Sequence, residues 1–600
     1  MPLSTEDVLP PLPVGPAVAA AAAAGAGASQ TAEFGAGTTG TVKAPPPPPP
    51  SANPPRIVII GAGSRGRTYA EAIETSTNGV VVAVVEPDAY KRRHLGRKHI
   101  WGPQGRDEPA EGEAFADWPD FVAYERARRS AAAETSSEGR KDVPPGVDAA
   151  FICVLDELHR PVIEALADLG GLHIMCEKPL ATTMDDCVAI YRALRRSSSE
   201  LVFSIGHVLR YSPHNMLLRR LLLADRAIGD VLSVVHTEPV GWWHFTHSYV
   251  RGNWRRESRT APSLLTKSCH DIDVLLWLLC SPPGYGYGYD DEAGGGGALG
   301  EAEETPHLPS TVSSSGSLQL FRKARKPVAA GAATNCLACP AEPDCKYSAQ
   351  RIYVGDQLRG LGAGNRRWPV SIVVPDIEDV AVRGGPDAAR DTLLQRLPDY
   401  GPATPAAEVA QRNWFGRCVF ESDNDVCDEQ VVVVTWDDDD KNTKGSGDGA
   451  GTHDSDPVAD RLRHRGAKTA TFHMVAHTTK ICDRYTHVYG VHGELYADQN
   501  TITVEDFRDG SVTVHRPPIE SHGHGGGDTG LTRQFVGAVD RVKNHGWPAA
   551  RAQRAVIGCT LEEVVRSHAL VFCAEAARLG KTVVDWPTWW AAEVEAKLAK

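Results

Sequence analysis

The chain has 600 residues, a formal net charge of −13 at pH 7 and 42% hydrophobic residues, enough to bury a large core in what we expect to be two domains. The negative charge argues against a general nucleic-acid-binding protein, which would need a basic face. The thirteen cysteines lack the dense, regular spacing of a small secreted scaffold, so we expect reduced thiols in a cytoplasmic protein.

Residues 1–54 are expected to be a disordered tail. An alanine-rich run from Ala17 is followed by "APPPPPPSANPP", which is typical of an extended polyproline spacer. The alanine-rich run is too short and too weakly apolar to span a bilayer, and residues 1–42 contain no Lys or Arg, unlike a mitochondrial presequence. The sequence therefore predicts no transmembrane segment and no membrane partner.

The stretch "RIVIIGAGSRGRTYAEAI" predicts a strand, a glycine-rich turn and a helix. In this spacing Gly61 permits the tight turn, Gly63 lets the backbone approach a pyrophosphate, and Gly66 allows close packing of helix on strand. The helix N-terminus, with Ser64 and Arg65, offers free N–H groups to the phosphates. The pattern indicates a dinucleotide-binding turn; the alternative is an unrelated strand–turn–helix.

A second predicted strand, "VVVAVVEPD", ends in Glu86, twenty residues beyond Gly66. A carboxylate at this place binds the ribose 2′-hydroxyl of a dinucleotide. Glu86 favours NAD over NADP because it repels a 2′-phosphate, although Arg92 and Arg93 nearby could reverse that preference.

After "RARRSAAAETSSEGRKDVPPG", which we expect to be an inserted polar loop, strands and helices alternate as far as residue 206. The alternation predicts a parallel, doubly wound sheet over residues 55–206. Ligands of such sheets bind at the carboxyl ends of the strands. The apolar run "LHIMCEKPLATT" ends there in Glu177 and Lys178, which places Lys178 at the edge where a dinucleotide would lie.

The Gly-x-Gly-x-x-Gly start, the strand ending in Glu-Lys-Pro and the later "CHDIDVLLWLL" together resemble the Gfo/Idh/MocA family, named for glucose–fructose oxidoreductase and inositol dehydrogenase. The resemblance covers residues 56 to about 280, and "GHGGGDTGLTRQFVGAV" with "CTLEEVVRSHALVFCAEAARL" extends it. It implies an α/β protein with an N-terminal Rossmann domain. A C-terminal α/β domain with an open, mostly antiparallel sheet would follow over residues 207–600, with polar insertions near 284–316 and 436–467.

The same resemblance implies an NAD(P)-dependent oxidoreductase acting on hydroxyls of sugars, inositols, related polyols or their acids. NAD is the expected cofactor and NADP is possible. The resemblance also implies a possible homo-oligomer through the C-terminal sheet.

Carried over to this sequence, the resemblance places Lys178 against the reacting hydroxyl, makes His270 the proton-transfer residue and makes Asp273 the acid three residues on. The residues that it places beside the cofactor, after the glycine turn and Glu86, are Leu155, His159, Glu177 and Lys178. The chemistry agrees independently, because oxidising an alcohol requires a base of near-neutral pKa and benefits from a fixed cation. The alternatives are a structural helix histidine and an ion pair that caps the strand.

Many dehydrogenases of this family carry an aspartate four residues before the histidine, where this chain has Thr266 followed by Lys267. A cation at Lys267 would favour an acidic substrate or replace the hydroxyl-binding role of the missing acid. The alternative is an ion pair between Lys267 and Asp271, one helical turn on.

The segment "EPVGWWHFTHSYVRGNWRRE", residues 238–257, is rich in tryptophan, histidine and arginine. Its aromatic rings could stack on a sugar face while its histidines bind hydroxyls; the alternative is an aromatic strand with a charged edge. The residues predicted to contact substrate are Arg210, Tyr211, Trp243, His244, His247 and Lys267.

Cys336, Cys339 and Cys345 have a partial metal-ligand spacing, but no fourth ligand follows locally. Cys418 or Cys427 could complete a site in space, and reduced thiols without a metal are the favoured interpretation. In "SHGHGGGD" the histidines His522 and His524 belong either to a metal site or to a glycine-rich loop that closes over the substrate, and Asp528 is expected to cap the helix that follows.

Two other functions stay open. One is a glycosidase that uses tightly held NAD to oxidise its sugar transiently, although the signature of that group is not found. The other is a non-catalytic dinucleotide-binding sensor, against which the presence of both Lys178 and His270 argues, since a sensor needs neither.

Overall fold

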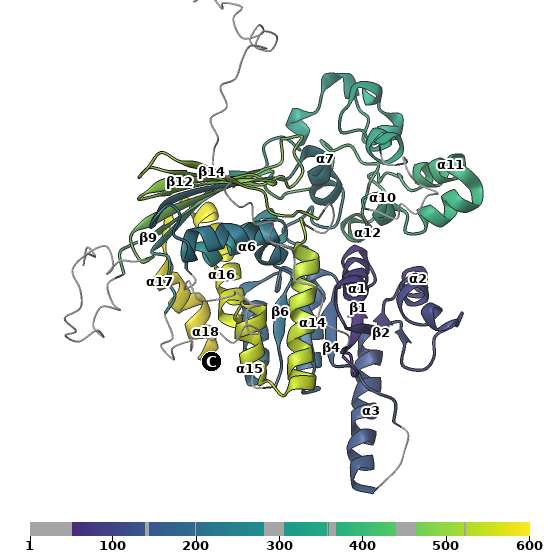
Figure 1. Ribbon diagram of the computed structural model, residues 1–600. Helices are drawn as coiled ribbons and strands as arrows, with labels where there is room; N and C mark the ends of the chain where they lie inside the picture. Colours follow the sequence, from purple (N-terminus) through teal and green to yellow (C-terminus); the bar gives the residue numbers. More distant parts are fainter. Residues whose placement is uncertain are drawn as a thin grey trace, which may run out of the picture. The chain divides into compact units, whose positions relative to one another are not determined.

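The computed structural model describes residues 51–138, 143–197, 200–280, 305–356, 358, 368–439, 464–520 and 524–599. Except for its last four residues, the predicted tail of residues 1–54 lies outside this part of the chain. The described residues form a six-stranded and a nine-stranded sheet with helices packed against them (Figure 1). Among the described helices, none combines the length and the apolar character needed to cross a membrane.

The six-stranded sheet is parallel, with the order β3-β2-β1-β4-β5-β6. Its strands are β1 (Arg56–Ile60), β2 (Val80–Val85), β3 (Ala114–Phe115), β4 (Ala149–Ile152), β5 (His173–Cys176) and β6 (Phe203–Ile205). The helices between them are α1 (Ser64–Ser76), α2 (Ala89–His99), α3 (Trp118–Glu138), α4 (His159–Ala167) and α5 (Met184–Arg196). The strand order reverses between β1 and β4, which creates a ligand crevice at their carboxyl ends. The predicted doubly wound parallel sheet is confirmed.

Helix α3 replaces most of the predicted polar loop. It covers the alanine-rich stretch that follows Arg129, and residues 139–142 lie outside the described chain. Glu125 accepts hydrogen bonds from Arg128 and Arg129, one turn on, and such pairs stabilise a helix whose outer face is polar. The prediction of a loop was wrong because it rested on the polarity of the segment alone. It left out the hydrogen-bonded pairs of Glu125 with the two arginines and the high helix propensity of alanine.

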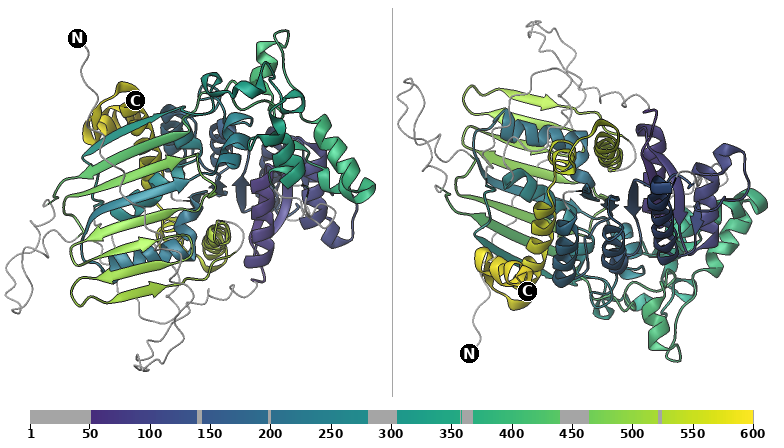
Figure 2. Two further views of the ribbon diagram at one scale, coloured as in Figure 1. Left: turned by 90° about the horizontal axis from the view of Figure 1, so that it is seen from above. Right: turned by 90° about the horizontal axis from the view of Figure 1, so that it is seen from below.

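The nine-stranded sheet has the order β14-β13-β12-β11-β7-β10-β9-β8-β15, and among its neighbouring pairs only β7 and β10 run parallel. Its strands are β7 (Val231–Pro239), β8 (Thr311–Ser317), β9 (Glu429–Trp436), β10 (Lys468–Val475), β11 (Tyr485–Gly490), β12 (Gly493–Ala497), β13 (Ile502–Asp506), β14 (Val512–His515) and β15 (Val583–Asp585). Burial alternates along β9 and β10, so one face is covered and the other is open (Figure 2). The predicted mostly antiparallel second sheet is confirmed.

Some of the remaining helices pack on the covered face of this sheet, and others pack against the helices of the parallel sheet (Figure 1). They are α6 (Pro213–Arg219), α7 (Trp242–Phe245), α8 (Ser263–Thr266), α9 (Cys269–Leu279), α14 (Gly527–His545), α15 (Ala549–Ala552), α16 (Leu561–Gly580), α17 (Trp586–Trp590) and α18 (Ala596–Leu598). Helix α16 begins with a capping box, in which Thr560 and Glu563 satisfy each other's backbone N–H groups.

The predicted insertions are corrected in part. Strand β8 occupies the end of the region near 284–316, where its serine-rich sequence gave no apolar alternation, and it pairs in full register with β9. Residues 281–304 and 440–463 lie outside the described chain. An unpredicted segment between β8 and β9 has its own apolar cluster and includes α10 (Val370–Val373), α11 (Ile377–Gln395) and α12 (Ala406–Gln411).

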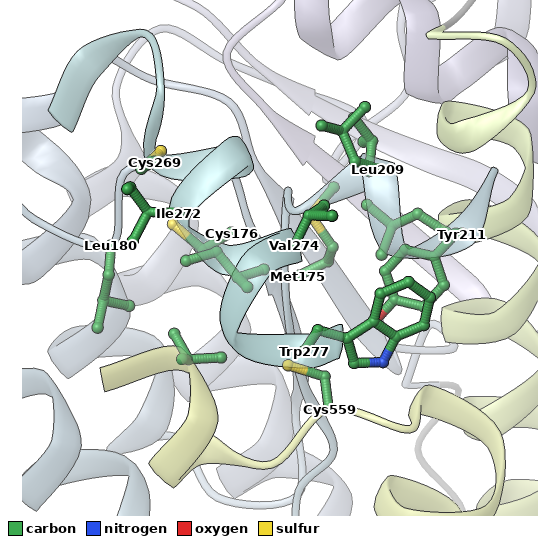
Figure 3. Close-up of a cluster of buried hydrophobic side chains, with 14 of the residues drawn as sticks. Met175, Cys176, Leu180, Leu209, Tyr211, Cys269, Ile272, Val274, Trp277 and Cys559 are labelled. Carbon is green, nitrogen blue, oxygen red and sulfur yellow. The ribbon is translucent and has the colours of Figure 1, made fainter. Parts of the chain in front are cut away.

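Helix α9 is buried along its whole length and ties the two sheets together. Its Ile272 and Val274 pack in one cluster with Met175 and Cys176 of β5 (Figure 3). Fully burying a side chain of this size contributes about 1.5–3 kcal/mol. This packing fixes the first turn of α9 against the carboxyl end of β5, where Lys178 follows.

Candidate active site

The glycine turn after β1 has the geometry that a pyrophosphate requires. Gly61 has φ +100°, and a Cβ on Gly66 would stand 1.9 Å from the Gly61 carbonyl oxygen, so neither position accepts a side chain. A Cβ on Gly63 would meet no atom within 4 Å, which leaves open space above the backbone. Gly63 caps α1 without a side-chain hydrogen bond, so the helix N-terminus is available to an anion.

Glu86 follows β2 beside this turn and is buried. Its Oε2 accepts a hydrogen bond from the Ala62 N–H at 2.7 Å, and its Oε1 accepts one from the Asp88 N–H at 3.0 Å. The carboxylate is therefore fixed at the place where a dinucleotide ribose would lie. Leu155 follows β4 with 48% of its surface exposed and offers an apolar contact at the same edge.

Arg65, in the first turn of α1, connects three acidic or hydroxyl groups. Its guanidinium donates to Glu177 at 2.7 Å, to Asp528 at 2.6 Å and to the Tyr69 hydroxyl at 2.7 Å. Burial alone would raise the pKa of the Glu177 and Asp528 carboxyl groups, but the Arg65 cation outweighs it and holds both below their ordinary values. The Arg65 guanidinium is thus engaged by protein groups and fixes Glu177 in place, while the cofactor contact predicted for the first turn of α1 concerns its main-chain N–H groups.

Lys178 stands at the carboxyl end of β5 with its side chain half-buried. Its Nζ donates a hydrogen bond to the Thr266 main-chain carbonyl at 2.7 Å. The loop that carries it is fixed by His159, which is fully buried and has its Nδ1 2.7 Å from the Pro179 carbonyl oxygen. His159 was predicted to contact the cofactor, but its burial gives it the role of supporting this loop.

His270 lies in the first turn of α9 and is 5% exposed. Burial and, next in size, the Lys178 charge lower the pKa of His270 well below its ordinary value. The imidazole is therefore neutral at neutral pH and able to accept a proton. Its Nδ1 has no hydrogen-bond partner among the described residues. The structure thus brings Lys178 and His270 together from two separate elements.

Asp273, one turn along α9, is fully buried. It accepts hydrogen bonds from Arg210 at 2.7 and 2.8 Å in a bidentate pair. Burial alone would raise the pKa of Asp273, but Arg210 lowers it below its ordinary value. The catalytic role predicted for Asp273 stays a prediction, and the structure places its carboxylate against Arg210 inside the core.

Three of the predicted substrate residues lie in the core. Arg210 is one of them, because it pairs with Asp273, and the other two are Tyr211 and His247. The Tyr211 hydroxyl donates to the Ile557 carbonyl oxygen at 3.2 Å, and the side chain is 4% exposed. His247 is buried, with its Nδ1 2.8 Å from the Tyr353 hydroxyl and its ring stacked on Phe415. The Tyr211 hydroxyl and His247 Nδ1 thus have partners within the protein, and the substrate contacts predicted for these residues stay predictions.

Trp243 and His244 remain half-buried on α7. The Trp243 ring lies 4.9 Å from that of Trp368, and the His244 ring lies 4.7 Å from the same indole. Trp254, which was considered for sugar stacking, instead donates its indole N–H to Asp156 at 2.8 Å.

Lys267 does not pair with Asp271. Its Nζ lies 3.0 Å from Glu238 Oε1, and Asp271 instead accepts a hydrogen bond from Arg484 at 2.5 Å. Arg484 also contacts Glu238, so two cations and two carboxylates form a neutral buried group. Burial alone would lower the pKa of Lys267, but its neighbours Cys482 and Glu238 raise it well above the ordinary value. A simple role for Lys267 in attracting an acidic substrate is not supported by this pairing.

Residues 55–207 match the family model described as "Oxidoreductase family, NAD-binding Rossmann fold", that of Gfo/Idh/MocA. Over these residues, which form the parallel sheet and its helices, the chain is similar to the Gfo/Idh/MocA family. The resemblance read from the glycine turn and the Glu-Lys-Pro strand is confirmed, as is the prediction of NAD as cofactor.

Curated relatives match parts of this chain. It is 28% identical over 224 residues to inositol 2-dehydrogenase 2 of Saccharopolyspora erythraea, covering 37% of this chain and 53% of that protein. It is 28% identical over 138 residues to 2,7-anhydro-N-acetylneuraminate hydratase of Escherichia coli, covering 23% of this chain and 35% of that protein. The chain thus spans between about a third and about half of the length of the curated relatives it matches.

Among solved structures, an inositol dehydrogenase homolog complexed with NAD+ from Azotobacter vinelandii superposes with a TM-score of 0.51 at 13% identity. The superposition covers 89% of this chain and 98% of that one. At this identity the likeness concerns the fold alone, and it agrees with the arrangement of the two sheets described above.

Several residues that line the site had no sequence signal. Asp528 was expected to cap α14, but the cap is Gly526 and the carboxylate turns to Arg65. His524 lies 3.2 Å from that carboxylate and 6.1 Å, ring to ring, from His270, whereas His522 lies outside the described residues. Arg484 lies in the sequence "ICDRY", in which no motif or residue spacing indicates a site residue.

The cysteines form no metal centre in the described part of the chain. All thirteen are unpaired, and among the described residues no three His, Cys, Asp or Glu side chains gather closely enough to hold a metal ion. Cys336 and Cys418 follow Asn335 and Arg417, which form a short antiparallel bridge. Pairing of the backbone therefore positions these two cysteines.

Proposed function

We propose that this protein is an NAD(P)-dependent oxidoreductase that acts on a hydroxyl of a sugar, inositol or related polyol. The observation that carries the proposal is the juxtaposition of Lys178 and His270 at the carboxyl edge of the parallel sheet. One is a cation held by a main-chain carbonyl, and the other is a neutral imidazole. A dehydrogenase needs both groups, and a dinucleotide sensor needs neither.

The cofactor would be held by the residues of the Rossmann edge. Gly61, Gly63 and the first turn of α1 would face the pyrophosphate, Glu86 the adenosine ribose, and Leu155 the apolar rings. When bound, the nicotinamide supplies the site for hydride exchange. The open space above Gly63 and the uncapped helix N-terminus fit this group.

Lys178 and His270 would divide the acid–base work. The Lys178 ammonium polarises the substrate oxygen and stabilises negative charge that develops on it. His270 accepts the hydroxyl proton at Nε2, because its neutral state persists at neutral pH. Glu177 and Arg65 act as positioning residues that fix the end of β5 and the first turn of α1.

The relatives guide the substrate class. Two are named inositol 2-dehydrogenases of Saccharopolyspora erythraea, and others are named levoglucosan dehydrogenase and 1,5-anhydro-D-fructose reductase. All of these names denote ring compounds with several hydroxyls. We therefore extend the proposal to cyclic polyols and anhydrosugars, with their acids as a further class to be tested.

The test is a screen of inositols, sugars, anhydrosugars and sugar acids with NAD and NADP, followed through the nicotinamide absorbance. The proposal expects reduction of the dinucleotide with at least one cyclic polyol, and a loss of that signal in the Lys178→Met variant. Dinucleotide binding without turnover across the whole screen would instead favour the sensor.

A second candidate is a reaction that oxidises the sugar only transiently and releases no reduced cofactor. The relative named 2,7-anhydro-N-acetylneuraminate hydratase favours it. Product analysis by mass spectrometry with catalytic amounts of NAD separates the two, because only this candidate converts its substrate with no net change in the dinucleotide.

Two finer points belong to the same proposal. Thirteen unpaired cysteines favour a reducing compartment such as the cytoplasm. A homo-oligomer would use the open face of the nine-stranded sheet, where Val235, Tyr489 and Tyr496 are exposed. Size-exclusion chromatography with light scattering tests the second point, and a Tyr489→Lys variant should dissociate the assembly.

A further inference from the structure

Cys482 lies in the connection between β10 and β11, with its thiol against a lysine. Its Sγ is 3.0 Å from Lys267 Nζ and 3.7 Å from His244 Nδ1. The Lys267 ammonium is held from its other side by Glu238 Oε1, also at 3.0 Å. A thiol, an amine, an imidazole and a carboxylate from four separate segments therefore meet at one point.

The backbone holds Cys482 in this position. Its φ of +55° lies in the left-handed region, which non-glycine residues adopt only when neighbouring structure requires it. The Cys482 N–H donates to the Pro239 carbonyl at 2.7 Å, and Arg484 donates to the Cys482 carbonyl at 3.3 Å. Cys482 is half-buried as a residue, and the proposal requires that hydrogen peroxide reach its sulfur.

We propose that Cys482 and Lys267 form a reversible covalent sulfur–nitrogen cross-link when the thiol is oxidised by a peroxide. In the first step the sulfur attacks hydrogen peroxide, the O–O bond breaks, and a sulfenic acid and one water form. In the second step Lys267 passes one proton to Glu238, its nitrogen attacks the sulfur, the S–O bond breaks, and the hydroxyl leaves as water with a second proton from the nitrogen. Two electrons from a thiol reductant restore both side chains.

The neighbouring groups set the pH dependence of the first step. Burial raises the pKa of the Cys482 thiol and Lys267 lowers it, with a net direction upward. Burial and, next, Lys267 lower the pKa of His244 well below its ordinary value, so a neutral imidazole stands beside the thiol to accept its proton. Because the thiolate is the reacting form, we expect cross-linking to quicken as the pH rises.

The cross-link would affect the candidate active site through the main chain. A sulfur-bound Lys267 nitrogen loses its positive charge, and Glu238, which has taken its proton, is no longer ion-paired with it. Thr266, the preceding residue, carries the carbonyl that holds Lys178. A shift of Lys267 toward sulfur therefore displaces the anchor of Lys178, and this consequence for turnover rests on the proposed function.

The test treats the full chain with hydrogen peroxide and measures its mass and its peptides before and after a thiol reductant. We expect a loss of two hydrogens and a linked pair of peptides containing Lys267 and Cys482, both reversed by the reductant. The Cys482→Ser and Lys267→Arg variants should show no linked pair, since a guanidinium keeps its proton and does not condense. The Cys153→Ser variant, which removes another half-buried thiol, should keep it.

Oxidation of Cys482 to sulfinic acid without any linked peptide in the unmodified chain would overturn the proposal. A link that persists in Lys267→Arg would overturn it as well. The mass readout does not depend on activity, so it stands even if the proposed function fails. If the unmodified protein turns over a substrate, the turnover of the linked fraction should be about a hundredfold lower and should recover when the reductant is added. Unchanged turnover in a fully linked sample would refute the coupling to Lys178.

Discussion

The Lys178 ammonium donates a hydrogen bond to the Thr266 main-chain carbonyl, with 2.7 Å between Nζ and the oxygen. This contact joins the carboxyl end of β5 to α8, which immediately precedes the helix of His270. A carbonyl dipole orients an ammonium without cancelling its charge, whereas a carboxylate partner would neutralise it. In the mechanism that we propose, a substrate oxygen uses this charge.

The fixed carboxylate of Glu86 predicts that NAD binds at least about tenfold more tightly than NADP, a difference of about 1.4 kcal/mol. The Glu86→Gln variant removes the charge that repels a 2′-phosphate and should bring the two affinities close together. Isothermal titration calorimetry with both dinucleotides measures the ratio. Tighter binding of NADP by the unmodified protein would show that Glu86 does not face the ribose.

The lowered pKa of His270 predicts the pH dependence of turnover. Burial and the Lys178 charge keep the imidazole neutral below its ordinary pKa of about 6.5, so kcat/KM should hold down to that pH and fall only further below it. The His270→Asn variant should lose about 10²–10⁴ in rate together with this acid limb. His473→Asn, which changes a partly exposed histidine of β10, is the control. An acid limb that survives in His270→Asn would assign the base elsewhere.

The bidentate pair of Asp273 and Arg210 predicts a loss of stability rather than of chemistry. Replacing Asp273 by Asn removes the bidentate pair and leaves the buried Arg210 cation with Glu563, at 3.3 Å, as its remaining carboxylate. Breaking a buried pair costs up to about 3–5 kcal/mol. The midpoint of thermal unfolding should fall by several degrees, and turnover per folded molecule should change little. A stable Asp273→Asn protein with strongly reduced turnover would restore the catalytic role that the sequence suggested.

The contacts of Arg65 with Glu177 and Asp528 predict how the free energy of unfolding changes as the pH falls. Because the folded-state pKa values of Glu177 and Asp528 are depressed, their contribution is present above the unfolded carboxyl pKa of about 4 and is lost as the pH falls through the folded values. The Asp528→Asn variant should therefore be less stable than the unmodified protein at pH 7, and the difference should shrink toward pH 2. Thermal unfolding at a series of pH values measures this, and a constant difference would contradict the assignment.

Local spacing allowed part of this site to be predicted from sequence. The roles expected of Gly61, Gly63 and Gly66 depend on a few neighbouring residues, and the structure gives each glycine the environment that its role requires. The position of Lys178 at the mouth of the sheet follows from the end of an apolar run at a proline. These features need no knowledge of how distant segments meet.

The rest of the site depends on contacts between distant parts of the chain. Arg65 and Asp528 are 463 positions apart, and Lys267 finds Cys482 across 215 positions, so no local pattern marks either pair. The spacing of His270 and Asp273 was correctly assigned to one helix, but the spacing gave no sign that Arg210 would occupy the carboxylate. The serine-rich strand β8 was not predicted, because pairing with β9 stabilises it and its own sequence has no strand pattern.

The central claim is that the Lys178 charge is used in catalysis, and the Lys178→Met variant tests it most directly. Methionine keeps most of the stem and removes the ammonium. Lys468→Met is the matched control, because Lys468 is also a buried lysine whose Nζ donates to a main-chain carbonyl, that of His464 at 2.7 Å. Melting temperature, NAD affinity and turnover are measured on each preparation.

For Lys178→Met we predict turnover lower by about a hundredfold or more, the scale of losing one preorganised electrostatic donor, with NAD affinity and melting temperature nearly unchanged. For Lys468→Met we predict near-normal turnover per folded molecule. A Lys178→Met protein that is stable, binds NAD and turns over substrate at a near-normal rate would contradict the account.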